Sequence, residues 1–453
     1  MLVTEMQSPP SITSLTKILE DSLYSVGEGK RGTLHVDEIK SAAFLVYRAM
    51  TNRSRYYHDL SHLFDVAQGL PALGKLAAIY HDVVYFSVDR GISTEVNTIL
   101  GDVVVFDDDR IFLTDSPDEL VANVITIFGF IGGQELKQES GLNEFLSAVV
   151  AVRELRKFLT DQELWTVAAC IEATIPFRPM VNGTPHYNLL GKRLGSLRHS
   201  AFTLTEEKIH DIKVLAVKIA NADVQNFGNP DFGKFIENTW QLLSESNADF
   251  YHASGFSIRM YREELMRMKS FFTMLQPEVI FRHYGNTPND VDYKALLECS
   301  RNHLRDALEY VNVSIATISI VEALAALNGG DAPLLYFMSA TDSRIFHQLT
   351  TGKRGADKID AHRSFWNETV MAELKAMHVR DQRFDHALLP IAAYFYELLG
   401  SDGIAELVER ANDVHAGKQN WKWFLTSVPT ENLSEVATAL ASSAALRKDR
   451  IDE

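Results

Sequence analysis

The sequence predicts an all-α protein, and two observations support that prediction. Apolar residues recur at spacings of three and four in stretches such as IKVLAVKIANAD (212–223) and HALLPIAAYFYELLG (386–400), which is the period of an amphipathic helix. Helix stops are also visible, because Gly400 ends the second stretch directly before Ser401, a pattern typical of a C′ glycine and a new N-cap. The stretch VVVF (103–106) is the clearest candidate for a strand.

Three segments of different content follow one another along the chain. Residues 1–34 predict an N-terminal helical extension that ends in a glycine-rich turn. Residues 35–285 hold nearly all the motifs, and the turn-rich stretch GNTPNDVD (285–292) is a plausible boundary. Residues 293–453 predict a helical accessory domain without recognisable chemistry. The glycines of the N-terminal turn are Gly27, Gly29 and Gly32.

The charge balance of the 453 residues limits the classes of partner. Lysine and arginine number 44 against 60 aspartates and glutamates, which gives a net charge of −16. A broad nucleic-acid surface needs clustered cations, so the composition argues against one, and equally against binding to anionic membranes. A small phosphorylated substrate remains compatible with this charge, because a bound metal ion supplies local positive charge.

Cysteine usage and the N-terminus indicate the cellular compartment. Only Cys170 and Cys299 occur, which excludes a disulfide framework or a cysteine-type zinc site. The N-terminal residues do not show the cationic start and apolar core of a signal peptide. No uninterrupted apolar run reaches the ~20 residues that a membrane helix needs. We therefore expect a cytoplasmic protein without a membrane segment.

The chemistry is concentrated in the stretch RYYHDLSHLFDVAQGLPALGKLAAIYHDVVY (55–85). His58 and His62 are four residues apart, so on a helix they would share a face beside an apolar stripe. The dipeptide His81–Asp82 follows inside an apolar stretch. A charged aspartate in such a place is costly unless it is paired or coordinated.

A further carboxylate, that of Asp223, occupies a core-facing position far downstream. The apolar stripe that leads to it consists of Ile212, Leu215, Ala216 and Ile219. Buried carboxylates usually have a cationic partner. A divalent metal shared by His62, His81, Asp82 and Asp223 would supply one. Mixed imidazole and carboxylate ligands suit zinc, iron or manganese, and magnesium would suit a second, more hydrated position.

These residues resemble the HD superfamily of metal-dependent phosphohydrolases, whose pattern is a His, a His-Asp dipeptide and a distant Asp on helices of one domain. Tyr57-His58 with His62 and Asp65-Val66 is similar to the YHN-x2-H-x2-DV pattern of class I cyclic-nucleotide phosphodiesterases, although Asp59 replaces the Asn. The HDVVY segment resembles that of bacterial predicted metal-dependent HD phosphohydrolases. The resemblance covers residues 35–285 and implies an HD-type helical bundle.

The resemblance also implies roles for single residues. The metal ligands would be His62, His81, Asp82 and Asp223, with one or two ions bound. His58 matches the non-ligand histidine that acts as general acid, and Asp82 would also reach a second metal through water. Glu95 falls where the bacterial relatives carry a Glu, and it would either orient His58 or simply complement a helix dipole. Asp65 and Arg55 are weaker candidates for supporting the site or contacting phosphate.

The predicted function is therefore hydrolysis of a phosphate ester or anhydride, on a small, nucleotide-like substrate, by metal-activated water with His58 as general acid. One alternative is a catalytically silent regulator that binds metal or nucleotide and uses the C-terminal helices to bind a protein partner or a second copy. Another is a purely structural helical protein, which would leave Asp82 and Asp223 without partners in apolar surroundings.

Overall fold

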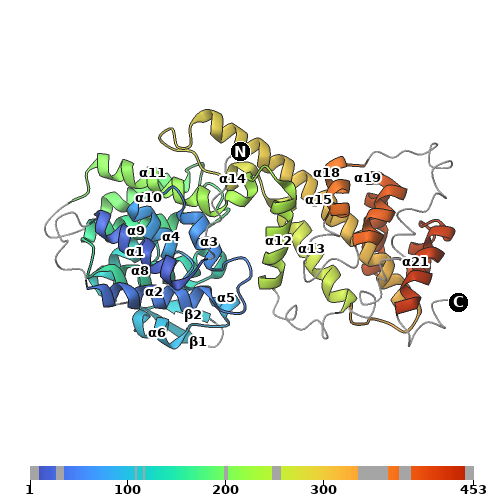
Figure 1. The fold of residues 1–453 in the computed structure, drawn as a ribbon, viewed down its shortest axis with the longest axis horizontal. Helices are drawn as coiled ribbons and strands as arrows, with labels where there is room; N and C mark the ends of the chain where they lie inside the picture. The colour runs from blue at the N-terminus through green and yellow to red at the C-terminus, as the bar shows by residue number, and fades with distance from the viewer. Residues whose placement is uncertain are drawn as a thin grey trace. The chain divides into compact units, whose positions relative to one another are not determined.

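The computed structural model confirms an all-α fold, and its contacts divide the chain into two compact units (Figure 1). Unit 1 comprises Met1–Gly228 and Gln276–Cys299, and unit 2 comprises Asn229–Leu275 and Ser300–Glu453. The structure describes residues 10–26, 35–107, 110–115, 118–197, 203–246, 257–334, 366–376 and 389–443.

Unit 1 is built from helices with one small sheet. Its described helices are α1 (Ile12–Val26), α2 (Val36–Met50), α3 (Leu60–Ala67), α4 (Ala72–Tyr80), α5 (Phe86–Asp89), α6 (Thr94–Leu100), α7 (Glu119–Phe128), α8 (Leu142–Leu155), α9 (Asp161–Ala173), α10 (His186–Ser196), α11 (Glu206–Asp223) and α14 (Pro277–Ile280), with the 3₁₀ turns η1 (Gln138–Ser140) and η2 (Gln225–Gly228).

Helix α9 is the central helix of unit 1. It packs against α4, α7, α8 and α11, and every residue from Leu164 to Ala173 is buried. A helix that is apolar on all sides is expected to lie inside the core. A capping box between Thr160 and Glu163 fixes where it begins, and Trp165 is its largest buried side chain. Helices α4 and α11, at whose ends candidate metal ligands lie, are therefore both supported by this buried helix.

Helix α1 belongs to this core, which corrects the prediction of an N-terminal extension. It packs on α2 and α4, and Leu15, Leu19 and Leu23 are almost fully buried in the hydrophobic core of unit 1. The prediction rested on the glycine-rich turn between α1 and α2. This turn separates the two helices in the sequence, but both helices pack in the same domain. That turn lies outside the described residues.

The small sheet confirms the strand expected around residues 103–106. Strands β1 (Val104–Asp107), β2 (Arg110–Leu113) and β3 (Glu135–Leu136) are antiparallel in the order β1-β2-β3. In its register Val104 pairs with Leu113, and Ile111 pairs with Leu136. These four side chains are buried, so the sheet contributes to the core of unit 1.

The regular secondary structure of the described part of unit 2 is helical, apart from an isolated β-bridge between Ser257 and Pro333. Its helices are α12 (Phe232–Ser246), α13 (Ile258–Met274), α15 (Asp290–Leu327, which begins in unit 1), α18 (Glu368–Ala376), α19 (Leu389–His415), α20 (Trp421–Leu425) and α21 (Thr430–Ser443). The helix stop predicted at Gly400 is present, because this residue interrupts α19 with a φ of 64°.

The division between the units differs from the predicted boundary. Residues 229–275 belong to unit 2, and the chain then returns to unit 1 for residues 276–299. The turn at 285–292 exists, with positive φ at Gly285 and Asn286, but it lies inside unit 1. Turn chemistry shows where a chain reverses, and it does not show which core the next segment joins.

Helix α15 is long and apolar enough to cross a membrane by length and composition. Its most apolar window has a mean hydropathy of 1.7, yet 83% of that window is buried inside the protein, as in a core helix. Polar residues interrupt the run, which is why no continuous apolar stretch is visible in the sequence. The Thr317 hydroxyl donates to the carbonyl of Val313 at 2.8 Å and is thereby satisfied within the helix.

We predict that Leu19→Ala destabilises unit 1 by about 2–5 kcal/mol, the usual cost of truncating a fully buried leucine. Leu19→Met, which nearly conserves volume, should cost less than about 1.5 kcal/mol. Hydrogen exchange followed peptide by peptide measures unit 1 separately from unit 2. Unchanged protection of α4 in the alanine variant would show that α1 is a dispensable extension after all.

Candidate metal centre

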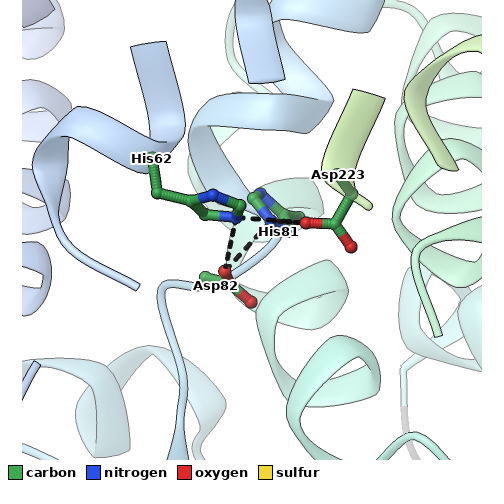
Figure 2. Close-up of side chains that lie close together, drawn as sticks. All are labelled: His62, His81, Asp82 and Asp223. Carbon is green, nitrogen blue, oxygen red and sulfur yellow. Dashed lines mark hydrogen bonds and ion pairs between the residues drawn. The ribbon is translucent and has the colours of Figure 1, made fainter. Parts of the chain in front are cut away.

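Four side chains from three separate segments meet in unit 1: His62, His81, Asp82 and Asp223 (Figure 2). One potential ligand atom from each lies within 4.8 Å of all the others. Figure 2 shows the two imidazoles and two carboxylates pointing toward one another from separate segments of the chain. Among the described residues this is the group of histidine, cysteine and acidic side chains arranged to hold a metal ion.

His62 is positioned by the beginning of α3. Asp59 is the N-cap, and its carboxylate accepts hydrogen bonds from the backbone N–H groups of Ser61 and His62 at 2.8 and 3.2 Å. Aspartate is among the residues preferred at helix N-caps, so Asp59 fixes where α3 begins. His58 precedes the helix, which corrects the expectation that His58 and His62 share one helical face.

His81 and Asp82 lie where α4 ends, not within a helix as the HD pattern implied. His81 is the C-cap residue of α4 and is almost completely buried. Its Nδ1 lies 2.7 Å from the carbonyl oxygen of Ala78. Because a carbonyl can only accept, Nδ1 carries a proton, and Nε2 is the ring nitrogen that faces the other three residues and would bind a metal.

The turn that contains Asp82 is held from two sides. From one side Arg55 donates to the Asp82 carbonyl at 2.6 Å and forms an ion pair with Asp89 at 2.6 Å. From the other side α8 contributes Ser147, whose hydroxyl accepts from the Val84 N–H at 3.0 Å. These contacts fix the backbone and leave the Asp82 carboxylate directed at the histidines.

Asp223 is the last residue of α11, at the end of the apolar stripe that predicted its inward position. Its Oδ1 lies 3.1 Å from Nε2 of His62 and 3.2 Å from Nε2 of His81. The Oδ2 atom of Asp82 lies 3.0 Å from Nε2 of His81 and 3.6 Å from that of His62. Each carboxylate therefore faces both imidazoles.

These separations fit the edges of a coordination polyhedron. With metal–ligand bonds of ~2.1 Å, neighbouring ligand atoms are about 3.4 Å apart in a tetrahedron and about 3.0 Å apart at right angles. The four nitrogen–oxygen distances run from 3.0 to 3.6 Å. Moreover, the buried Oδ2 of Asp82 has no hydrogen-bond partner of proper geometry. The residues present therefore fit a divalent cation.

The electrostatics of the cluster also favour a cation. Burial alone would lower the pKa of His81, but the carboxylates of Asp82 and Asp223 raise it well above its usual value. Burial acts to raise the pKa of Asp82, and the neighbouring histidines, His81 foremost, lower it below its usual range. The same opposition lowers the pKa of Asp223 to about 2. Both carboxylates are thus ionised and attract positive charge.

His58 lies beside the four residues without being one of them. Its ring centroid is 5.4 Å from that of His62 and 4.7 Å from that of Tyr85, with both ring pairs nearly perpendicular. Its charge contributes to lowering the pKa of Asp82, which places it close to that carboxylate. This arrangement suits a group that acts next to a metal but does not bind it.

Three residues assigned weaker roles are not among the four candidate ligands. The side chain of Arg55 is fully buried and engaged as described, so it does not reach a substrate. Glu95 lies in the first turn of α6, is half exposed and pairs with Arg48, as the helix-dipole alternative implied. Glu95 and Arg48 line a cavity whose wall contains none of the four candidate ligands. Asp65 is exposed on α3; burial raises its pKa, and the nearby His62 opposes that shift.

Glu144 is a candidate that the sequence reasoning missed. It lies in the first turn of α8, and its Oε2 atom is buried without a hydrogen-bond partner. Burial raises its pKa to about 7, and the charges of Asp82 and Asp223 act in the same direction. An acidic residue within the apolar stretch LNEFLSAVV was the available signal, the same one that marked Asp82.

Comparisons with known proteins do not extend these observations. No protein-family model matches the chain, and neither the curated proteins nor the solved structures contain a significant match.

We predict that His81→Ala strips a bound divalent metal from the purified protein, because a ligand at the centre of the cluster is removed. Metal content measured by plasma mass spectrometry should fall to background. His210→Ala is the matched control and should retain the metal. His210 lies on α11, the helix that ends at Asp223, and its ring is hydrogen-bonded to Tyr284. Wild-type protein that holds no metal after incubation with zinc, manganese or iron would end this interpretation.

We predict that Glu144→Gln stabilises the chelator-treated protein at pH 8 but not near pH 4.5. Burial raises the pKa of Glu144 to about 7 in the folded protein, from 4.5 in the unfolded chain. Between pH 4.5 and 7, Glu144 therefore keeps its proton in the folded state and loses it in the unfolded state. The free energy of unfolding therefore falls as the pH rises through this window, by up to about 1.4 kcal/mol per pH unit. Denaturation at several pH values, with the exposed Glu139→Gln as control, measures the difference. Parallel pH profiles for wild type and Glu144→Gln would refute it.

Proposed function

We propose that this protein is a metal-dependent hydrolase of a phosphate ester or anhydride, with a small nucleotide-like substrate. The observation that supports this most strongly is the convergence of two imidazoles and two ionised carboxylates within 4.8 Å, at the ends of α4 and α11 and the beginning of α3. The resemblance of the same residues to the HD pattern points to the same chemistry.

In this proposal His62, His81, Asp82 and Asp223 hold the divalent ion. When bound, such an ion acidifies a coordinated water and neutralises charge on a phosphoryl oxygen. The protein contributes the orientation of the ligands. The Ala78 carbonyl holds the tautomer of His81, while Arg55 and Ser147 hold the turn that presents Asp82.

His58 is the proposed proton donor to the departing oxygen. It lies next to His62 and close enough to Asp82 to act on its charge. Glu144 has a buried carboxylate oxygen without a hydrogen-bond partner, and the charges of Asp82 and Asp223 act on it. It is suited to accept a proton from the attacking water.

A metal-supplemented hydrolysis screen tests this function. It should cover bis(p-nitrophenyl) phosphate, cyclic nucleotides, nucleoside mono-, di- and triphosphates and alarmones, with His81→Ala as the inactive control. Turnover by the wild type that is absent in the variant supports the hydrolase. A protein that binds metal yet hydrolyses none of these compounds would instead be the regulatory, catalytically silent alternative.

We predict that His58→Ala retains the metal but loses roughly 10²–10⁴-fold in turnover of a substrate with a poor leaving group, the usual scale of general acid catalysis. The loss should shrink for p-nitrophenyl esters, whose leaving group needs little protonation. Steady-state kinetics and metal analysis of the same preparation measure both effects, with His210→Ala as control. Loss of the metal would make His58 a ligand, and unchanged turnover would remove it from the mechanism.

A further inference from the structure

A second cluster of charged side chains lies in unit 1, and the function proposed above does not use it. At its centre is Glu172, near the end of α9, with a side chain only 1% exposed. Its Oε1 accepts from Arg178 at 2.8 Å and from Arg193 at 2.7 Å. Arg282 completes the group, because its guanidinium donates to the carbonyl oxygens of Ala173, directly after Glu172, and of Ile175.

The charges of this cluster do not balance. Three guanidinium groups remain protonated at any physiological pH, and Glu172, which pairs with Arg178 and Arg193, is the one carboxylate that forms an ion pair with any of them in the described structure. The side chains of Arg178 and Arg193 are only 15% and 21% exposed. Leaving two positive charges without partners so far from water is unfavourable. An anion bound to the arginines would offset that cost.

The arginines also have donors to offer. A guanidinium carries five N–H donors, and the described hydrogen bonds of Arg178 use two of its nitrogens, both on Glu172. The Nε atoms of Arg178 and Arg193 are buried and have no hydrogen-bond partner. A buried N–H of this kind is satisfied when an oxygen atom of a bound ligand accepts from it. Phosphate oxygens match the planar fork of arginine well.

This cluster adjoins the candidate metal centre. The side chain of Asn221, two residues before Asp223, donates to the carbonyl of Arg282 and accepts from its N–H, both at 2.8 Å. The charge of Asp223 also acts on Arg282, and that of Arg178 acts on Glu144. One residue of the arginine cluster is therefore anchored to the end of α11, where Asp223 lies.

We propose that Arg178, Arg193 and Arg282 form an anion-binding subsite that takes a phosphate group next to the one at the metal centre. This inference rests on the proposed function. It assigns a substrate with at least two phosphates, such as a nucleoside diphosphate or triphosphate. Glu172 holds two of the arginines in place, and the ligand supplies the negative charge that the cluster lacks.

Pyrophosphate is the probe that tests this subsite, by isothermal titration calorimetry on the full-length protein. Wild type should bind it, and Arg178→Gln and Arg282→Gln should each weaken binding about tenfold or more. Arg153→Gln is the matched control, because Arg153 is also mostly buried and pairs with one carboxylate and with backbone carbonyls. It should bind like the wild type.

His81→Ala separates this proposal from the proposed function. The variant removes the metal centre, so pyrophosphate that it still binds is held by the arginines, whether or not the protein is a hydrolase. Folded His81→Ala that binds no pyrophosphate would overturn the subsite, even if the arginine variants fail to fold. Folded Arg178→Gln and Arg282→Gln variants that bind as tightly as wild type would also overturn it and leave a purely structural ion-pair network.

Discussion

The structure of unit 1 depends on two buried carboxylates that face two buried imidazoles. Asp82 and Asp223 lose water when they enter the core, and only positive charge between them and the histidines compensates for that loss. The ends of α4 and α11 must therefore meet within a few ångströms. The buried helix α9 packs against both of these helices and fixes their separation.

Arg55 shows how a cation can serve such a site without competing with a metal. Its charge is compensated by Asp89, and its remaining donors bind backbone carbonyls of the turn. The arginine therefore determines where the Asp82 backbone lies while its own charge is already neutralised. The imidazoles remain the positive or metal-binding partners of the Asp82 carboxylate.

The sequence predicted the fold class and the four clustered residues because both depend on local patterns. Helical periodicity indicated the helices, and charged residues in apolar stretches indicated Asp82 and Asp223. The arginine cluster could not be predicted, since Glu172, Arg193 and Arg282 come together only through tertiary packing. The contacts of Arg55 could not be predicted for a related reason: its partner Asp89 is 34 residues away in the sequence, and no spacing rule links the two. Likewise, turn residues located the reversal at 285–292 but not the return of the chain to unit 1.

That return has a consequence for how the protein is made. A ribosome releases the chain from its N-terminus, and domains generally fold as units as they emerge. Unit 1 is interrupted, however, because 229–275 belong to unit 2 and precede the segment that completes unit 1. Arg282 therefore becomes available only after the whole of this unit 2 segment has been synthesised. Unit 1 can therefore be completed only after translation has passed residue 299.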